Sequence, residues 1–209
     1  MRQTWVVLIM IVALGGGAWG QDTPRVEAFA GYSLDYASFP LRNGTDNLGN
    51  VRGFLNGWNS SATFNFNRWL GLVADFGGHY GHAHGSKDIT VLPPNCFVGC
   101  TGPVTATLHN VHTFTFGPEI ANRQEKFTIF GRALFGGAHT REDIDSFASF
   151  ITPVFSETKF AMIADGGVDV SFSPRLALRI QPGYLMTHML DQRQNSFRFS
   201  TGVVLRLGR

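Results

Sequence analysis

The chain has 209 residues, enough for one domain or a single small barrel. Charged residues make up 15% of it, fewer than in most water-soluble domains, and hydrophobic residues make up 44%, too few for a bundle of membrane helices. The net charge of +2 gives no reason to expect a nucleic-acid partner.

The first twenty residues have the composition of an export signal. Arg2 is followed by an apolar stretch at 5–14 and by the small-x-small sequence Ala18-Trp19-Gly20. The apolar stretch is too short to cross a membrane as a helix. We therefore expect residues 1–20 to be a cleaved signal peptide of the general secretory route, with 21–209 as the mature domain. The alternative is an uncleaved anchor.

Eight later segments alternate between two kinds of side chain. In the third, Leu72, Phe76 and Tyr80 occupy even positions, whereas Asp75 and His79 occupy odd positions. In every segment one alternate set of residues lacks charged side chains. The segments are 25–36, 54–66, 70–82, 106–120, 127–139, 160–172, 176–188 and 197–207. Period-two alternation over about ten residues, repeated behind an export signal, predicts an all-β fold, an eight-stranded antiparallel up-and-down transmembrane β-barrel.

The connections between these segments alternate in length. Residues 67–69, 121–126 and 173–174 are short, and we expect longer loops at 37–53, 83–105, 140–159 and 189–196. Short periplasmic turns and long external loops are typical of outer-membrane barrels. Pro182 lies within the seventh segment, where it cannot donate a ladder hydrogen bond, so a β-bulge is expected at Pro182-Gly183.

A family resemblance rests on several stretches of this sequence. The run FAMIADGGVDVSFSPRLALRIQPGYLMT, followed by QNSFRFSTGVVLRLG, resembles the final hairpins of OmpA/OmpX-type small outer-membrane barrels, and especially their stand-alone porin-like barrel domain. EAFAGYS, FTFGPEI and FTIFGRALFGGAH fit the same family. The resemblance implies the outer membrane of a Gram-negative cell. It also implies outer-membrane lipid, lipopolysaccharide and the barrel-assembly machinery as partners.

Charged residues concentrate on the face predicted to point into the lumen. They are Arg25, Glu27, Asp75, Glu119, Arg132, Asp165, Asp169, Arg179, Arg198 and Arg206. Because eight-stranded barrels fill their interior with side chains, we interpret these residues as an ion-pair network that plugs the lumen. A gated ion path is the alternative, and catalytic carboxylates are the weakest interpretation.

The histidines all map near the external ends of the predicted strands. They are His79, His82, His84, His109, His112, His139 and His188. We expect them to form an external rim, most simply an interfacial belt of amphipathic rings. Contact with lipopolysaccharide phosphates and binding of Zn or Cu are the alternatives. No resident metal and no cofactor are expected.

Two further features lie in the predicted external loops. Cys96 and Cys100 are expected to form a disulfide in an oxidising compartment, with metal ligation as the alternative. Residues 140–159 contain the apolar side chains of Phe147, Phe150, Ile151, Val154 and Phe155, which either cover the barrel mouth or contact a surface ligand.

The expected role is therefore structural or surface interaction through external loops. A narrow gated pore is the alternative. A lipid-modifying enzyme is less favoured, because the predicted outer wall offers no acid to orient a histidine beside a serine.

Overall fold

The computed structural model describes residues 23–43, 46–91, 100–146, 154–189 and 192–208. Within these ranges, side chains are described for 23–36, 52–81, 110–141, 156, 158–187 and 194–208. The described residues contain no helix that is long and apolar enough to cross a membrane.

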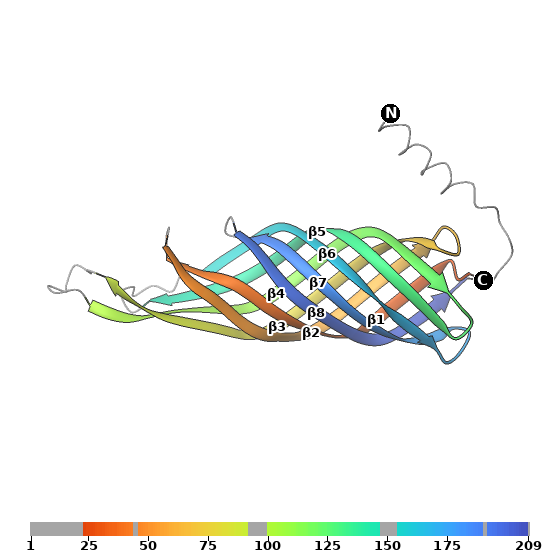
Figure 1. Cartoon of the computed structure of the whole chain (residues 1–209), viewed down its shortest axis with the longest axis horizontal. Helices are drawn as coiled ribbons and strands as arrows, with labels where there is room; N and C mark the ends of the chain where they lie inside the picture. The colour runs from red at the N-terminus through yellow and green to blue at the C-terminus, as the bar shows by residue number, and fades with distance from the viewer. Residues whose placement is uncertain (1–22, 44–45, 92–99, 147–153, 190–191, 209) are drawn as a thin grey trace, which may run out of the picture.

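The described residues form eight strands. They are β1 (Val26–Asn43), β2 (Asp46–Asn65), β3 (Leu70–Val91), β4 (Cys100–Arg123), β5 (Phe127–Ser146), β6 (Val154–Ser171), β7 (Leu176–Met189) and β8 (Gln192–Leu207). Each strand pairs antiparallel with the next, and β1 pairs with β8, from Val26 opposite Leu207 to Tyr36 opposite Phe197. The strands thus close into the cylinder seen in Figure 1, and the prediction of an eight-stranded meander barrel is confirmed.

The alternating sequence separates an apolar wall from a polar lumen. Along β3, Leu72, Phe76 and Tyr80 are exposed, whereas Asp75 and His79 are completely buried. Because side chains of a strand alternate between its two faces, the exposed set faces lipid and the buried set fills the lumen. Large exposed side chains follow this rule on every strand, from Tyr32 on β1 to Leu207 on β8.

Exposed aromatic residues mark both ends of this wall. Tyr36 contacts Phe54 and lies opposite Phe197 at the loop end. Trp69, in the short β2–β3 connection, and Phe127, the first residue of β5, lie at the opposite end. Such aromatic belts sit where lipid headgroups meet the hydrocarbon.

The external loops are shorter than the sequence predicted, because the strands continue into them. Pairing extends to Asn43 opposite Asp46, Val91 opposite Cys100, and Asp143 opposite Val154. The long β3–β4 hairpin projects well beyond the rest of the barrel in Figure 1. The alternation ends where lipid ends, but backbone pairing needs no apolar face, so the pattern underestimates strand length.

The bulge predicted at Pro182-Gly183 is wrong. The β6–β7 register is the same on both sides of the proline, with Asp165 opposite Gly183 and Val168 opposite Ile180. Only the two intervening pairs are missing, while Pro182 still pairs with Phe199 on β8. The barrel therefore accommodates the missing N–H by a local gap in one ladder, with no extra residue.

Candidate functional site in the barrel lumen

Four charged side chains form a closed quartet inside the lumen. The Arg132 guanidinium donates two hydrogen bonds to the Asp165 carboxylate, at 2.7 and 3.0 Å. Arg198 joins the two acids, at 3.1 Å from Asp75 and 3.3 Å from Asp165, and Arg132 lies 3.8 Å from Asp75. Positive and negative groups thus alternate around a ring contributed by β3, β5, β6 and β8. All four side chains are at most 1% exposed.

Neutral amides complete the hydrogen bonding of this quartet. The Asn59 amide donates to both Asp75 oxygens at 3.1 Å, and Gln181 donates to Asp165 at 3.0 Å. Arg132 also donates to Ser61 Oγ at 3.3 Å. Buried charges are tolerated only when paired and hydrogen-bonded, and this quartet meets both requirements.

A second ionic cluster lies toward the short-turn end. Arg179 donates two hydrogen bonds to Asp169, at 2.7 and 2.8 Å. Glu27 lies among three guanidinium groups, 3.6 Å from Arg123, 3.6 Å from Arg206 and 4.0 Å from Arg179. Glu119 completes the cluster through Arg123, at 3.2 Å.

An aromatic ring separates the two ionic clusters. The Arg179 guanidinium lies over the Phe130 ring, 4.2 Å from its centroid, and the Arg132 guanidinium lies 5.3 Å from the same centroid. Phe29 provides a second ring for Arg179, at 5.3 Å. Stacking on aromatic faces favours Arg over Lys and holds the guanidinium planes in place. The structure brings together nine of the ten charged residues that the sequence placed on the inward face. The placement of Arg25 is wrong: it precedes β1 and is exposed.

Several lumen groups were missed by the sequence prediction, and one of them is Asp35 on β1, which is 1% exposed. Arg123 was assigned to a turn, yet it ends β4 and its side chain pairs with Glu119 and Glu27. Asn59 and Gln181 carry no charge, so they were not part of the predicted ion-pair network. Their inward parity was the available signal, because a polar residue on a buried strand face needs a partner.

His79 lies inside the lumen and not on the external rim. Its ring is completely buried, and Nε2 lies 2.8 Å from Ser33 Oγ, which is itself 2.8 Å from Ser200 Oγ. The physical reason is its odd position on β3, which shares the inward face with Asp75. The Ser33–His79 contact resembles a nucleophile and its base, but among the described residues His79 Nδ1 has no hydrogen-bond partner to orient it.

Two of the remaining histidines are described on the outer wall. His112 Nε2 lies 3.0 Å from Tyr80 Oη, and the two rings meet edge to face. His139 lies directly opposite His112, and its nitrogens contact Thr158 Oγ1 at 2.9 Å and Ser156 Oγ at 3.3 Å. The side chains of His82, His84, His109, His188 and Cys100 are not among those described, and Cys96 lies outside the described residues, so the expected Cys96–Cys100 disulfide stays a prediction.

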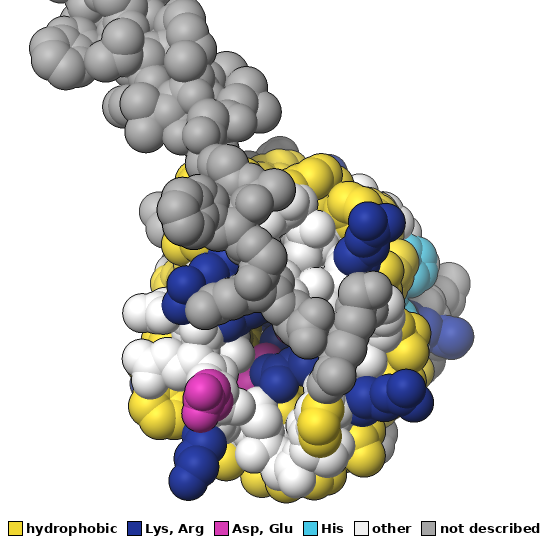
Figure 2. Space-filling view, turned by 90° about the vertical axis from the view of Figure 1, so that its right-hand side faces the viewer, with side chains coloured by type: hydrophobic (Ala, Val, Ile, Leu, Met, Phe, Trp, Pro, Cys, Tyr) yellow, Lys and Arg dark blue, Asp and Glu magenta, His cyan; other side chains and the backbone are white. Residues whose placement is uncertain are grey.

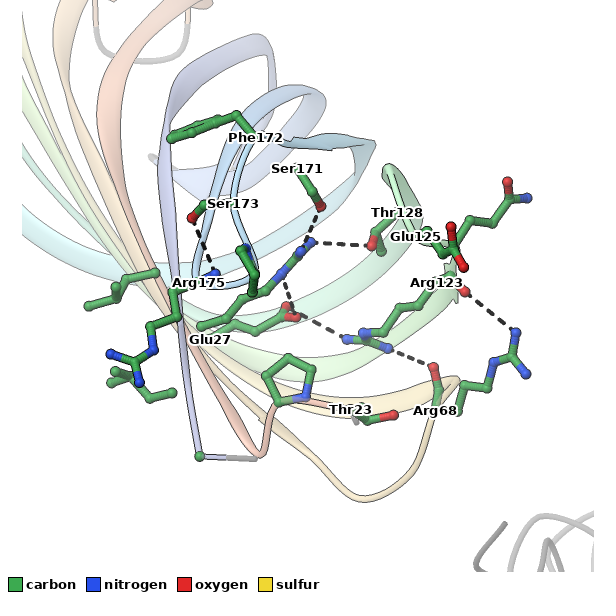
Figure 3. Close-up of a pocket in the computed structure, with 17 residues that line it drawn as sticks. Thr23, Glu27, Arg68, Arg123, Glu125, Thr128, Ser171, Phe172, Ser173 and Arg175 are labelled. Carbon is green, nitrogen blue, oxygen red and sulfur yellow. Dashed lines mark hydrogen bonds and ion pairs between the residues drawn. The ribbon is translucent and has the colours of Figure 1, made fainter. Parts of the chain in front are cut away.

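The lumen widens into a cavity at the short-turn end. Its volume is about 1340 Å³, and Glu27, Arg123 and Arg206 line its inner part. Figure 3 shows Arg123 pointing toward Glu27, with Arg68 and Arg175 at the edge of the opening. Arg206 is fixed by Ser171 Oγ at 2.7 Å. Among the described residues, no group of three His, Cys, Asp or Glu side chains is arranged to hold a metal ion.

Solved structures with this fold are known, although no sequence family and no curated protein matches the chain. The attachment invasion locus protein Ail of Yersinia pestis, in complex with the heparin analogue sucrose octasulfate, is 15% identical with a TM-score of 0.50, covering 86% of this chain and 97% of Ail. Neisserial surface protein A is 14% identical with a TM-score of 0.56, covering 87% and 97%. OprG of Pseudomonas aeruginosa is 9% identical with a TM-score of 0.50, covering 91% and 99%.

These similarities and the lipid-facing wall define the class of the molecule. The protein has the fold of the small transmembrane β-barrels, a closed eight-stranded antiparallel meander. The similarities cover nearly the whole length of each neighbour, but at these identities they concern the fold alone.

Proposed function

We propose that this outer-membrane protein has a lumen closed by the Arg132–Asp165–Arg198–Asp75 quartet, and that it acts through its external surface. The observation that carries the proposal is the ring itself, whose four members come from β3, β5, β6 and β8 and are at most 1% exposed. An ion crossing the barrel would have to displace several charge-assisted hydrogen bonds at once. A narrow gated pore is the alternative function.

Conductance in a planar lipid bilayer tests the closed lumen. The wild-type protein should give no current steps, because the quartet fills the cross-section of the barrel. Replacing Arg132 and Arg198 together by Ser removes both guanidinium groups and should produce steps. Arg175→Ser, at an exposed turn, is the matched control and should remain silent.

Folding of each protein must first be verified by the mobility difference between heated and unheated samples. Regular current steps from the folded wild type would contradict a closed lumen and favour the pore.

For the external surface, we propose that His112 and His139 belong to an interfacial belt. Both lie just beyond the exposed rings of Phe114 and Phe160, and both bond to hydroxyl groups of the wall. Lipopolysaccharide would then be a neighbouring lipid of this belt. We further propose that the barrel-assembly machinery inserts the chain and that a surface ligand binds at 140–159. Of that segment, 147–153 lie outside the described residues. An enzymatic role gains no support from the buried Ser33–His79 pair.

Replacing His112 and His139 together by Gln tests the belt. Lipopolysaccharide binding between pH 5 and pH 8 should keep the same pH profile, and stoichiometric Zn²⁺ should not stabilise either protein against heat. A pH dependence that the variant loses would favour phosphate contact. A Zn²⁺ stabilisation that the variant loses would favour a metal site.

A further inference from the structure

We propose that the periplasmic end of the barrel binds the phosphate headgroups of anionic phospholipids. Four exposed cations surround this end, and they are Arg25, Arg68, Lys126 and Arg175. Figure 2 views the molecule from this end and shows Lys and Arg side chains distributed around the opening. The proposal concerns the outer edge of the barrel and is independent of whether the lumen conducts.

The placement of these cations follows the topology. Arg68 lies in the β2–β3 connection, Lys126 in the β4–β5 connection and Arg175 in the β6–β7 connection, while Arg25 directly precedes β1. Every strand connection at this end therefore carries one exposed cation, so the positive charge encircles the barrel.

These charges are available to a ligand. Among the described residues, none of the four cations forms an ion pair, in contrast to Arg123 and Arg206, which pair with Glu27. The exposed acid at this end, within the described chain, is Glu125. Four cations against one acid leave an excess of three positive charges on the outer edge, which attracts anions.

Apolar side chains beside the cations identify the ligand as a lipid. Trp69 follows Arg68 and is 39% exposed, and Phe127 follows Lys126 and is 41% exposed. Phe172, in the connection that holds Arg175, is 63% exposed. A soluble anion needs no apolar neighbour, whereas a phospholipid presents its phosphate just above its acyl chains. Cations next to an aromatic belt match that geometry.

Two tryptophans, one near each end of the barrel, serve as fluorescent reporters of the neighbouring lipids. Trp69 lies at the periplasmic belt, and Trp58 lies opposite Gly78, which in turn pairs with His112 near the external end. Replacing Trp5, Trp19 and Trp58 by Phe leaves Trp69 as the only indole of the full chain. Replacing Trp5, Trp19 and Trp69 instead leaves Trp58.

Each protein is inserted into vesicles of phosphatidylcholine with a minor fraction of phosphatidylglycerol. A nitroxide near the headgroup end of the acyl chain is carried by one lipid or by the other, at equal total label. The label on phosphatidylglycerol should quench the fluorescence of Trp69 more strongly than the label on phosphatidylcholine. The difference should correspond to a local enrichment of phosphatidylglycerol of about fivefold. Trp58 should show no preference. The preference at Trp69 should disappear in high salt, because exposed charges are screened.

Variants assign the effect to the cations. Replacing Arg25, Arg68, Lys126 and Arg175 by Gln should abolish the preference, whereas Arg52→Gln with Arg141→Gln, at the external end, should preserve it. Equal quenching of Trp69 by the two labelled lipids would overturn the proposal. So would an equal preference at Trp58, or one that persists in the four-fold variant. Should that variant fail to fold, the salt dependence of the wild-type preference decides.

Discussion

Arg179 is a fully buried cation of the lumen. Its side chain is 1% exposed, forms two hydrogen bonds with Asp169 and stacks on Phe130. Arg179→Met would leave Asp169 as a buried carboxylate without this partner, so we expect a loss of about 3–5 kcal/mol in the free energy of unfolding. Urea-induced unfolding in detergent micelles measures the change.

An exposed single substitution and a double substitution serve as controls for this result. Arg175→Met should change stability by less than about 0.5 kcal/mol, because Arg175 is exposed and forms no ion pair with another described residue. Asp169→Leu combined with Arg179→Met should recover much of the loss, since it removes the stranded charge. An unchanged midpoint for Arg179→Met alone would show that water solvates Asp169.

For single residues, the sequence predicted which face of the barrel a side chain occupies better than it predicted which residue that side chain pairs with. Parity alone placed Asp165 and Arg132 on the inward face, because side chains alternate along a strand. Their direct opposition on β5 and β6 depends on strand register, which parity does not determine. His79 shows the opposite error: its inward parity was visible, yet its nearness to the external end dominated the interpretation.

The strands β2 and β3 leave no room for a side chain at Gly57. A Cβ atom added to Gly57 would overlap the Gly78 carbonyl and lie 2.8 Å from His79 Cα. Because the obstacle is backbone, side-chain rearrangement cannot relieve it. Gly57→Val should therefore prevent folding in detergent, measured as loss of the mobility difference between heated and unheated protein. Gly131→Val is the control, since no atom of the described residues lies within 4 Å of its added Cβ. A folded Gly57→Val barrel would show that the two strands can separate locally.

Strand identity, but not strand length, could be predicted from the pattern. Each of the eight predicted segments coincides with one of the strands β1–β8, apart from the single end residues Arg25, Phe66 and Phe172, because lipid requires apolar residues at alternate positions. The extension of β3 to Val91 and of β4 back to Cys100 has no such signature. The bulge predicted at Pro182 was wrong for a related reason. A proline removes one hydrogen-bond donor from one ladder, and the sequence does not indicate which of the two neighbouring strands loses that hydrogen bond.

For the whole molecule, the sequence could predict closure because an open sheet would leave an unpaired edge in lipid. The arrangement of the lumen required the structure. Two ionic clusters separated by Phe130 arise from the stagger of eight strands, which brings together residues as distant in sequence as Asp75 and Arg198.

The composition of the quartet constrains the order of assembly. Arg198 is contributed by β8, the strand whose pairing with β1 closes the barrel. Until β8 docks, Asp75 and Asp165 share Arg132 alone among the four. A partly inserted sheet would therefore present an unbalanced negative face to the bilayer, at high energetic cost. Insertion and closure should accordingly be one concerted event, with the last strand neutralising charges that the third and sixth strands introduced.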